Sequence, residues 1–339
     1  MSNNNNQFER LRCIKRIDQT ADASTFEFEH LDQTPFSFQA GQFLTFEINY
    51  YNKLLYRAYS ICSSPAKPNS VTVAIKRVPG GKVSNYLLDN LQAGHALPAM
   101  PPAGNFTQQE NKTTNNLILM SAGSGITPCL AIAQDCLDNK SEANIHFIHS
   151  ARKSDDVIMA SLLTELAEKH NNFKLTLILE NTDNSEHLQG RIDIDMFNQL
   201  IPEIKERTIF ICGPSLYMKS VEEIASAVGF DFDYFHKESF VPEAKAGEPV
   251  FSDINHQITV PALDKEFMAN DQQTLLDAMH GAGIKVPYSC KSGICGACKC
   301  KVQGDVISTS TETLTAEQIE LGYVLTCSTK ANSDVIVEL

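Results

Sequence analysis

Four of the ten cysteines restrict the fold of this chain more than any other feature of its sequence. Cys290, Cys295 and Cys298 are spaced C-x4-C-x2-C, and Cys327 follows 29 residues after the third of them. Three thiolates from one tight loop and a fourth from a returning segment can converge on one small metal centre. The glycines inside the loop let the backbone wrap closely and direct N–H groups at the sulfurs.

The spacing favours one kind of centre over two alternatives. It is the pattern of plant-type [2Fe–2S] clusters, so we interpret Cys290, Cys295, Cys298 and Cys327 as cluster ligands. Zinc sites more often combine two short C-x2-C elements, and incidental clustering of thiols is the other alternative. Cys300 is an extra thiol just after the loop, and we expect it to be structural.

Length and charge exclude several classes of protein. The chain has 339 residues, which at roughly 100–200 residues per domain predicts two or three domains. Its net charge of −13 argues against nucleic-acid binding and fits either plain solubility or docking to a basic partner. No apolar run approaches the roughly 18 residues of a membrane helix. The start, with a polar tail at 2–7, is no secretory signal, so we expect a cytoplasmic protein without membrane insertion.

Residues 8–106 have the pattern of antiparallel β structure. Short apolar or alternating runs recur between turn-forming residues, and a single helix is predicted near Lys82–Asn90. This spacing favours a barrel or a sandwich. The predicted strands are Arg10–Ile17, Thr25–Phe28, Phe43–Ile48, Ala58–Cys62 and Val71–Val78.

Residues 113–236 change to strands that alternate with helices. That rhythm predicts a parallel, doubly wound sheet. The predicted strands are Leu117–Met120, Ile145–His149, Leu175–Leu179 and Thr208–Cys212, and the predicted helices are Thr127–Leu137, Asp156–Lys169 and Ser215–Val228.

A linker is predicted at residues 241–252, which are rich in Pro, Ala, Glu and Lys without periodicity. After it come strand-like runs, a short helix near Leu275–His280 and a last strand at Val335–Leu339. We therefore divide the chain into domains at 8–110, 111–240 and 253–339.

Two glycine elements end two of the predicted parallel strands. Gly123–Gly125 lies between a strand and a helix that begins near Thr127, and a helix N-terminus at that place attracts phosphate. Cys212–Pro214 ends a later strand. Because ligands of open α/β sheets bind at the carboxyl ends of strands, both elements are predicted to face one crevice. Each alone also fits a plain tight turn, with Cys212 as an ordinary buried cysteine.

Two further elements lie in the β-rich part. Arg57–Ser60 (RAYS) offers a guanidinium for a phosphate, a ring for stacking and a small hydroxyl. Gly80–Leu87 (GGKVSNYL) places a glycine turn before a helix whose N-terminus can bind a diphosphate. Taken singly, the first is more often an ordinary strand and the second an ordinary helix cap.

In their order along the chain these elements resemble one family. RAYS, GKVS, GSGITP and CGP occur as in ferredoxin–NADP⁺ reductase-like flavoproteins, and the cysteine loop looks like the ferredoxin module of oxygenase reductase components. The resemblance covers residues 8–339. It implies an antiparallel β-barrel flavin domain, an α/β doubly wound parallel-sheet nucleotide domain and an α+β β-grasp ferredoxin domain.

The resemblance implies a flavin site, and FAD more than FMN because a diphosphate helix is present. Tyr59 would flank the flavin ring, and Ser60 would lie near its N5 atom. The implied flavin-binding residues are Arg57, Ala58, Tyr59, Ser60, Ala74, Ile75, Lys76, Lys82, Val83, Ser84 and Phe240.

It also implies a nicotinamide site, with Ser60, Cys212 and Glu238 nearest the transferred hydride. Thr127 would lie near the carboxamide. The implied nucleotide-binding residues are Gly123, Ser124, Gly125, Ile126, Thr127, Ser150, Arg152, Cys212, Gly213 and Pro214.

The implied activity is electron transfer. A nicotinamide delivers a hydride, a [2Fe–2S] cluster accepts single electrons, and flavin chemistry connects the two. Positioning of the groups dominates such a reaction, so no acid–base dyad is expected, and His256 and His280 are interpreted as surface or core residues.

The resemblance leaves the choice of donor and acceptor less defined. Ser150, Arg152 and Lys153 could meet the 2′-phosphate of NADPH, although Arg152 fits equally well in a pair with Asp156; the resemblance favours NADH. Residues 236–240 and 310–328 resemble reductases that serve hybrid-cluster protein, which is the first expected acceptor. A di-iron or Rieske oxygenase or a desaturase is the alternative. A non-catalytic redox sensor is the competing class of function.

Overall fold

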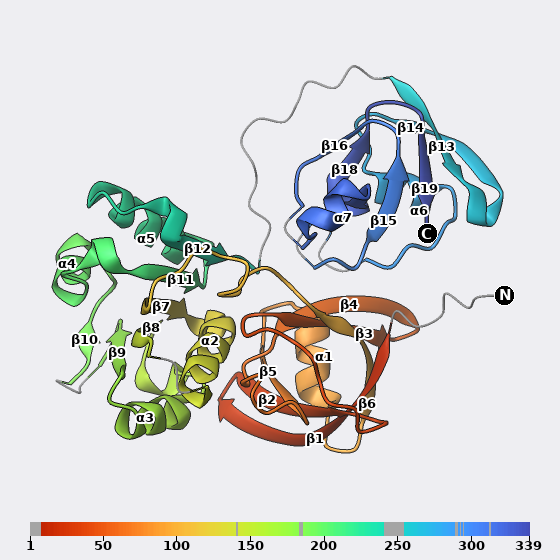
Figure 1. The fold of residues 1–339 in the computed structure, drawn as a ribbon. Helices are drawn as coiled ribbons and strands as arrows, with labels where there is room; N and C mark the ends of the chain where they lie inside the picture. The colour runs from red at the N-terminus through yellow and green to blue at the C-terminus, as the bar shows by residue number, and fades with distance from the viewer. Residues whose placement is uncertain are drawn as a thin grey trace. The chain divides into compact units, whose positions relative to one another are not determined.

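The chain forms two compact units, of which the first contains residues 1–44 and 59–240 and the second contains residues 45–58 and 241–339. The computed structural model describes residues 8–139, 142–182, 186–240, 254–288, 291, 293, 295–311 and 313–339. The predicted N-terminal tail, the linker at 241–252 and Cys290 lie outside the described residues. Figure 1 shows the elements of both units.

Six antiparallel strands and one helix make up the β-rich part. The strands are hydrogen-bonded in the order β4-β3-β6-β1-β2-β5. Ile61, just after β4, forms an antiparallel bridge with Val73 of β5, which brings the two ends of the sheet together as in the expected barrel. The elements are β1 (Glu9–Thr20), β2 (Ala23–His30), β3 (Phe43–Tyr50), β4 (Lys53–Ser60), β5 (Val71–Lys76), α1 (Lys82–Asn90) and β6 (Ala96–Ala103).

Strand β6 is not predicted by the sequence pattern. Its sequence, ALPAMPPA, contains three prolines, and proline lacks the N–H that a central strand normally donates. Nevertheless β6 lies between β3 and β1, with Pro98 opposite Arg10. The long β1 supplies this pairing, so tertiary context overrides the local signal.

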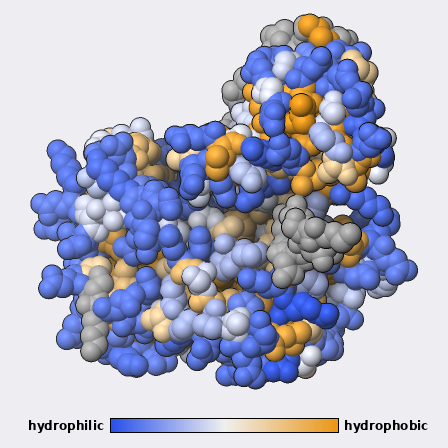
Figure 2. All heavy atoms as spheres, turned by 45° about the vertical axis from the view of Figure 1, so that its right-hand side comes forward, coloured by the Kyte–Doolittle hydropathy of each residue, from blue (hydrophilic) through white to orange (hydrophobic). Residues whose placement is uncertain are grey.

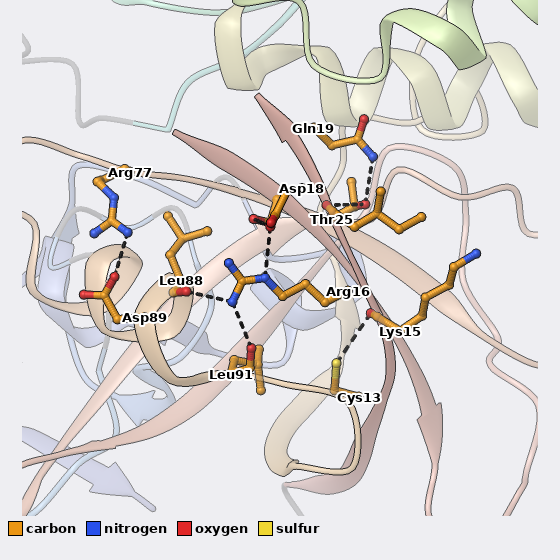
Figure 3. Close-up of polar contacts among 12 residues, drawn as sticks. Cys13, Lys15, Arg16, Asp18, Gln19, Thr25, Arg77, Leu88, Asp89 and Leu91 are labelled. Carbon is orange, nitrogen blue, oxygen red and sulfur yellow. Dashed lines mark hydrogen bonds and ion pairs between the residues drawn. The ribbon is translucent and has the colours of Figure 1, made fainter. Parts of the chain in front are cut away.

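Arg16, which lies on β1, binds the C-terminal end of helix α1. Arg16 Nη1 donates to the carbonyl of Leu88 at 2.8 Å and to that of Leu91 at 3.4 Å, and its Nε donates to Asp18 Oδ1 at 3.1 Å (Figure 3). Helix-end carbonyls lack intrahelical partners, and a cation at this end also matches the helix dipole. The glycine turn at the other end of α1 therefore has a fixed position.

The remainder of the first unit is a parallel sheet in the order β10-β9-β8-β7-β11-β12. The strand order reverses beside β7, which is the topology of a doubly wound sheet. The elements are β7 (Asn116–Ala122), α2 (Ile126–Asp138), β8 (Asn144–Ala151), α3 (Ala160–Lys169), β9 (Phe173–Leu179), β10 (Leu188–Gln189), α4 (Ile194–Leu200), β11 (Thr208–Cys212), α5 (Ser215–Ala227) and β12 (Phe235–Glu238).

Two apolar cores cover the two faces of this sheet. One contains Leu119 and Phe147 with residues of α2 and α3, and it continues into barrel residues such as Ala74. The other contains Met120 and Ile148 with residues of α4 and α5. Neighbouring residues of one strand therefore enter different cores, which explains why these strands are apolar throughout.

Helix α3 begins later than predicted. The sequence indicates a helix from Asp156, but Met159 adopts a left-handed backbone with φ 59°, and α3 starts at Ala160. A short 3-10 turn at Ser154–Asp156 precedes it. The acidic residues there have the composition of a helix start. The structure has a turn instead, and Val157 and Ile158, which follow it, are buried in the core.

The second unit contains a mixed sheet in the order β14-β13-β19-β15-β17, in which β13 and β19 are parallel. Helix α6 supplies Leu275 and Met279 to its apolar core, as expected of a β-grasp domain. The elements are β13 (Asn255–Val260), β14 (Lys265–Asn270), α6 (Leu275–Gly281), β15 (Lys299–Gln303), β16 (Val306–Ser308), α7 (Ala316–Glu320), β17 (Tyr323–Leu325), β18 (Thr329–Ala331) and β19 (Val335–Glu338).

Hydrophilic side chains cover most of the face seen in Figure 2, with smaller apolar areas on both units. None of the helices within the described ranges combines the length and the apolar character needed to cross a bilayer.

Two histidines are buried in strand β8. His146 Nε2 lies 2.8 Å from Thr176 Oγ1, and His149 Nδ1 lies 2.9 Å from Ser121 Oγ. Burial lowers the pKa of each imidazole to about 4, with Lys174 and then Arg207 adding to the effect at His146 and Lys76 adding to it at His149. Both rings are therefore neutral at neutral pH.

Replacing Arg16 by methionine is expected to lower the free energy of unfolding by about 1–3 kcal/mol, because two helix-end carbonyls lose a charged donor. Urea denaturation followed by circular dichroism measures the change. Arg191→Met is the matched control: Arg191 is 83% exposed and pairs with Glu180 at the surface, so a change within about 0.5 kcal/mol is expected. Equal losses in the two variants would contradict the anchoring of α1.

The two buried histidines predict that stability falls on acidification. Below pH ~6.5 the unfolded chain binds protons that the folded imidazoles reject until about pH 4, so stability decreases as pH falls through this window. Between pH 7.5 and 5.5 the His149→Asn variant should lose about 1 kcal/mol less than the parent chain. Urea titrations at the two pH values test this, and parallel losses in both proteins would rule it out.

Candidate functional site

The three residues expected nearest the hydride path come together in the first unit. Ser60 ends β4, and its Oγ donates to Glu238 Oε2 at 3.4 Å across 178 residues of sequence. Glu238 ends β12 and lies opposite Cys212 in the parallel register of β11 and β12. All three side chains are buried. Barrel and parallel sheet therefore meet at one polar point, which sequence order alone could not show.

Cys212 is a protonated thiol at this point. It is fully buried, and burial raises its pKa well above the ordinary value, with the nearby carboxylate of Glu238 adding to the rise. A thiolate is the nucleophilic form of cysteine, so this arrangement does not activate Cys212 for covalent chemistry. It presents a small neutral side chain beside a carboxylate.

The glycine turn after β7 has two kinds of glycine. Gly125 packs so closely on the carbonyl of Cys212 that a Cβ could not be accommodated, which ties the turn to the end of β11. Gly123 has φ +55° and open space where a Cβ would stand. An open, positive-φ glycine before a helix N-terminus leaves backbone accessible to a diphosphate. Thr127 is buried, and its hydroxyl donates to the carbonyl of Ser124 at 3.0 Å, so it closes the turn.

At the end of β8 the predicted nucleotide residues differ in their surroundings. Arg152 is exposed and pairs with Asp156, Nε to Oδ2 at 3.5 Å, which is the pairing considered from the sequence. The hydroxyls of Ser150 and of Tyr217, on α5, are buried and neighbour each other, and neither has a further hydrogen-bond partner among the described residues. Burial also raises the pKa of Tyr217. Because these buried hydroxyls have no polar partner besides each other, they could also bond the polar groups of a ligand such as a dinucleotide.

Sequence reasoning missed Tyr217, as well as the Ser121–His149 pair. Tyr217 follows the Cys212–Pro214 element by three positions, and Gly213 packs against its ring. That closeness to a recognised motif was an available signal. Ser121 and His149 lie opposite each other on β7 and β8, and a lone histidine in an apolar strand gives no indication of its partner.

The predicted flavin residues lie on β4, β5 and α1. Arg57 is exposed on β4, and Ala58 and Tyr59 are partly buried. Ala74 and Ile75 are buried on β5, where Lys76 Nζ bonds Asp22 Oδ1 at 2.8 Å. The ammonium group of Lys76 therefore already pairs with a carboxylate, whereas the sequence predicted that this strand edge would hold the flavin and its phosphates. Phe240 is exposed after β12.

The N-terminus of α1 fits a diphosphate. Its N-cap residue is Gly81, and no side chain caps the first turn. A Cβ on Gly81 would stand 2.8 Å from Ser84 Oγ, so only glycine leaves the turn this compact. Val83 is buried in the barrel core and could contribute only its backbone, whereas Lys82 is exposed and Ser84 is partly buried. Uncapped N–H groups in a first turn are ready donors to an anion.

The cysteine loop of the second unit places sulfurs and N–H groups together. Cys295, Cys298 and Cys327 are 3%, 2% and 6% exposed. The N–H of Cys327 donates to Cys298 Sγ at 3.4 Å, and the N–H of Gly293 donates to Cys327 Sγ at 3.2 Å. Gly293 has φ +75°. Buried sulfurs that accept backbone N–H bonds fit a cluster of thiolates, because such bonds stabilise the added negative charge.

Cys300 has the structural surroundings expected for it. It lies on β15 opposite Val324, and its side chain belongs to the apolar core of the unit. Burial raises its pKa to about 12, so it remains a thiol at neutral pH.

Comparison with known families covers all three parts of the chain. Residues 10–108 match the oxidoreductase FAD-binding domain family, and residues 119–223 match the oxidoreductase NAD-binding domain family. Residues 258–332 match the 2Fe–2S iron–sulfur cluster binding domain family. The fold resembles that of phthalate dioxygenase reductase, with a TM-score of 0.65 at 21% identity over 98% of both chains.

Relatives match the chain over nearly its whole length. The glycine betaine monooxygenase reductase subunit of Pseudomonas aeruginosa is 33% identical, covering 97% of this chain and 94% of the relative. A component of the 1,2-phenylacetyl-CoA epoxidase of Escherichia coli is 33% identical over 98% and 97%, and NADH oxidoreductase HCR from the same species is 30% identical over 97% of both. The chain is thus an NAD(P)H-dependent oxidoreductase that transfers electrons through FAD and a [2Fe–2S] cluster, and it belongs to the ferredoxin–NADP⁺ reductase-like flavoproteins with a C-terminal ferredoxin domain.

Proposed function

We propose that this reductase takes electrons from NADH and delivers them to the oxygenase component of a separate enzyme system. The observation that carries the proposal for the donor end is the convergence of Ser60, Cys212 and Glu238 at the carboxyl ends of β4, β11 and β12. This point joins the two predicted binding elements, one for the flavin and one for the nicotinamide, in a single buried location.

In this proposal the residues of the β-rich part and of the parallel sheet position two ring systems. FAD, when bound, supplies acceptance of a hydride and release of single electrons. The RAYS strand holds the flavin through Arg57, Ala58, Tyr59 and Ser60, and the uncapped first turn of α1 binds the diphosphate. The remaining flavin contacts come from the backbone of Ala74, Ile75 and Lys76 and from Phe240.

The nicotinamide end is organised by small and buried groups. Gly123–Thr127 and Cys212–Pro214 bind the nucleotide through backbone and small side chains. The small side chain of Cys212 leaves room for a flat ring. Ser60 orients the carboxylate of Glu238 through the 3.4 Å bond. Burial of all three side chains excludes water, which protects a hydride donor from competing reactions.

The proposed cluster ligands are Cys290, Cys295, Cys298 and Cys327. Support comes from the burial of the three described sulfurs and from the N–H groups directed at two of them. The corresponding domain limits are 8–110, 111–240 and 253–339, joined by the linker at 241–252.

NADH is proposed as the donor because acidic groups already occupy the basic side chains beyond β8. Arg152 pairs with Asp156, and Lys153 Nζ lies 3.7 Å from Asp155 Oδ2. A 2′-phosphate of NADPH would have to compete with both carboxylates for these basic groups, and the carboxylates would repel it. The 2′-hydroxyl of NADH imposes neither cost, and Ser150 can hydrogen-bond it.

The acceptor proposed first is an oxygenase component, because relatives at 33% identity belong to a monooxygenase and to an epoxidase. Hybrid-cluster protein, expected first from the sequence, is the second candidate, supported by the 30% identity to NADH oxidoreductase HCR. The protein's net charge of −13 supports a basic docking face on either acceptor.

Replacing one proposed ligand separates the two halves of the electron path. Cys327→Ser is expected to lower bound iron and acid-labile sulfide at least tenfold and to abolish reduction of cytochrome c, whose electrons come through the cluster. NADH-dependent ferricyanide reduction should persist, since ferricyanide accepts electrons from the flavin. Cys300→Ser is the control and should retain both activities and the metal. Because a serine oxygen can replace a thiolate on iron, full iron and sulfide together with parental visible and EPR spectra in Cys327→Ser would disprove the ligand assignment.

The proposed function is tested by an anaerobic titration of the purified enzyme with NADH and then with NADPH, followed by visible spectra. NADH should bleach both flavin and cluster, and in steady-state turnover with ferricyanide its kcat/KM should be at least tenfold above that of NADPH. Reduced enzyme is then mixed with an oxygenase component and with hybrid-cluster protein. Faster reduction of hybrid-cluster protein would replace the first acceptor with the second, and equal use of both nucleotides would refute the choice of donor.

A further inference from the structure

Ser310 lies beside the cysteine loop although it belongs to none of the motifs. Its Oγ donates to the carbonyl of Gly293 at 2.8 Å. The N–H of the same glycine donates to Cys327 Sγ at 3.2 Å. The Ser310 hydroxyl thus binds the carbonyl of Gly293, and the N–H of the same residue bonds the sulfur of Cys327.

The space around Gly293 leaves it little freedom. A Cβ there would stand 2.5 Å from Ser310 Cβ and 2.6 Å from Ser328 Oγ. The backbone is held at φ +75°, a conformation that favours glycine. Two serine side chains therefore fill the space beside the glycine and fix the direction of its N–H.

Ser328 joins Ser310 to the strand end that carries Cys327. Its Oγ lies 3.2 Å from the Ser310 carbonyl and 3.1 Å from the Leu325 carbonyl, and the N–H of Thr309 donates to the Ser328 carbonyl at 2.8 Å. Because Cys327 precedes Ser328 directly, these hydrogen bonds at Ser328 connect the segment with Ser310 to the segment with Cys327.

We propose that Ser310 is a positioning residue that raises the reduction potential of the [2Fe–2S] cluster by holding the Gly293 N–H on Cys327 Sγ, with Ser328 supporting it. This rests on the proposed ligation of the cluster by Cys327. Reduction adds one negative charge, and an N–H bond to a ligand sulfur stabilises that charge. Weakening the bond disfavours the reduced cluster and moves the midpoint to a more negative value.

The test is an EPR-monitored redox titration of full-length, cluster-loaded enzyme carrying Ser310→Ala. The expected result is a reduction equilibrium about threefold to tenfold less favourable, where tenfold corresponds to about 59 mV for one electron. The flavin midpoint, measured on the same sample, should not move. Ser308→Ala is the matched control, because Ser308 bonds Thr329 Oγ1 at 2.8 Å, only two residues away, and should leave the cluster midpoint unchanged.

Iron and sulfide are measured before each titration. A parent protein without two irons and two sulfides per chain would defeat the proposed function itself, whereas a loaded Ser310→Ala protein with the parental midpoint would overturn only the role of Ser310. If Ser310→Ala does not retain the cluster, Ser328→Ala decides the question. A smaller negative shift than predicted for Ser310→Ala supports the proposal, and an unchanged midpoint rejects it.

Discussion

The buried contact between Ser60 and Glu238 is the constraint on which the donor end of the molecule depends. It joins the last residue of a barrel strand to the last residue of the final strand in the parallel sheet. A buried carboxylate is costly unless it is hydrogen-bonded, so the contact is maintained only while both strand ends remain in register. Cys212, opposite Glu238, and Gly125, packed on the Cys212 carbonyl, extend the same junction to the glycine turn. Barrel, turn and sheet are therefore positioned by one continuous set of close contacts.

The acceptor end follows a different physical rule. There the backbone supplies the chemistry: N–H groups of Gly293 and Cys327 reach the sulfurs of Cys327 and Cys298. Backbone donors cannot be exchanged by substitution, so the protein controls them through side chains that fix the peptide planes. The proposed flavin site uses side chains and a helix end, whereas the sulfur site uses backbone N–H groups, so a substitution can change one without the other.

The sequence predicted the three domain folds and the FAD and [2Fe–2S] cofactors, which the family matches confirm, whereas the individual site residues stay predictions. The cysteine spacing, RAYS, GSGITP and CGP are short patterns whose chemistry requires particular residues at particular spacings, and the three proposed ligand cysteines within the described residues are buried. Pattern reasoning failed where tertiary contacts decide the backbone. Strand β6 forms despite Pro98 because β1 and β3 flank it, and α3 is shortened because Val157 and Ile158 are needed in the core. The junction of Ser60 with Glu238 spans 178 residues, a separation that no local pattern encodes.

This difference explains why ligands and tuning residues are found by different means. A ligand must present one atom type at one spacing, so its identity can be read in the local sequence. A residue that directs a peptide N–H at a ligand needs only a hydrogen-bonding group within reach, and any loop can provide it. Ser310 is 17 residues from Gly293, and serine at that place has no distinguishing signal until the chain is folded.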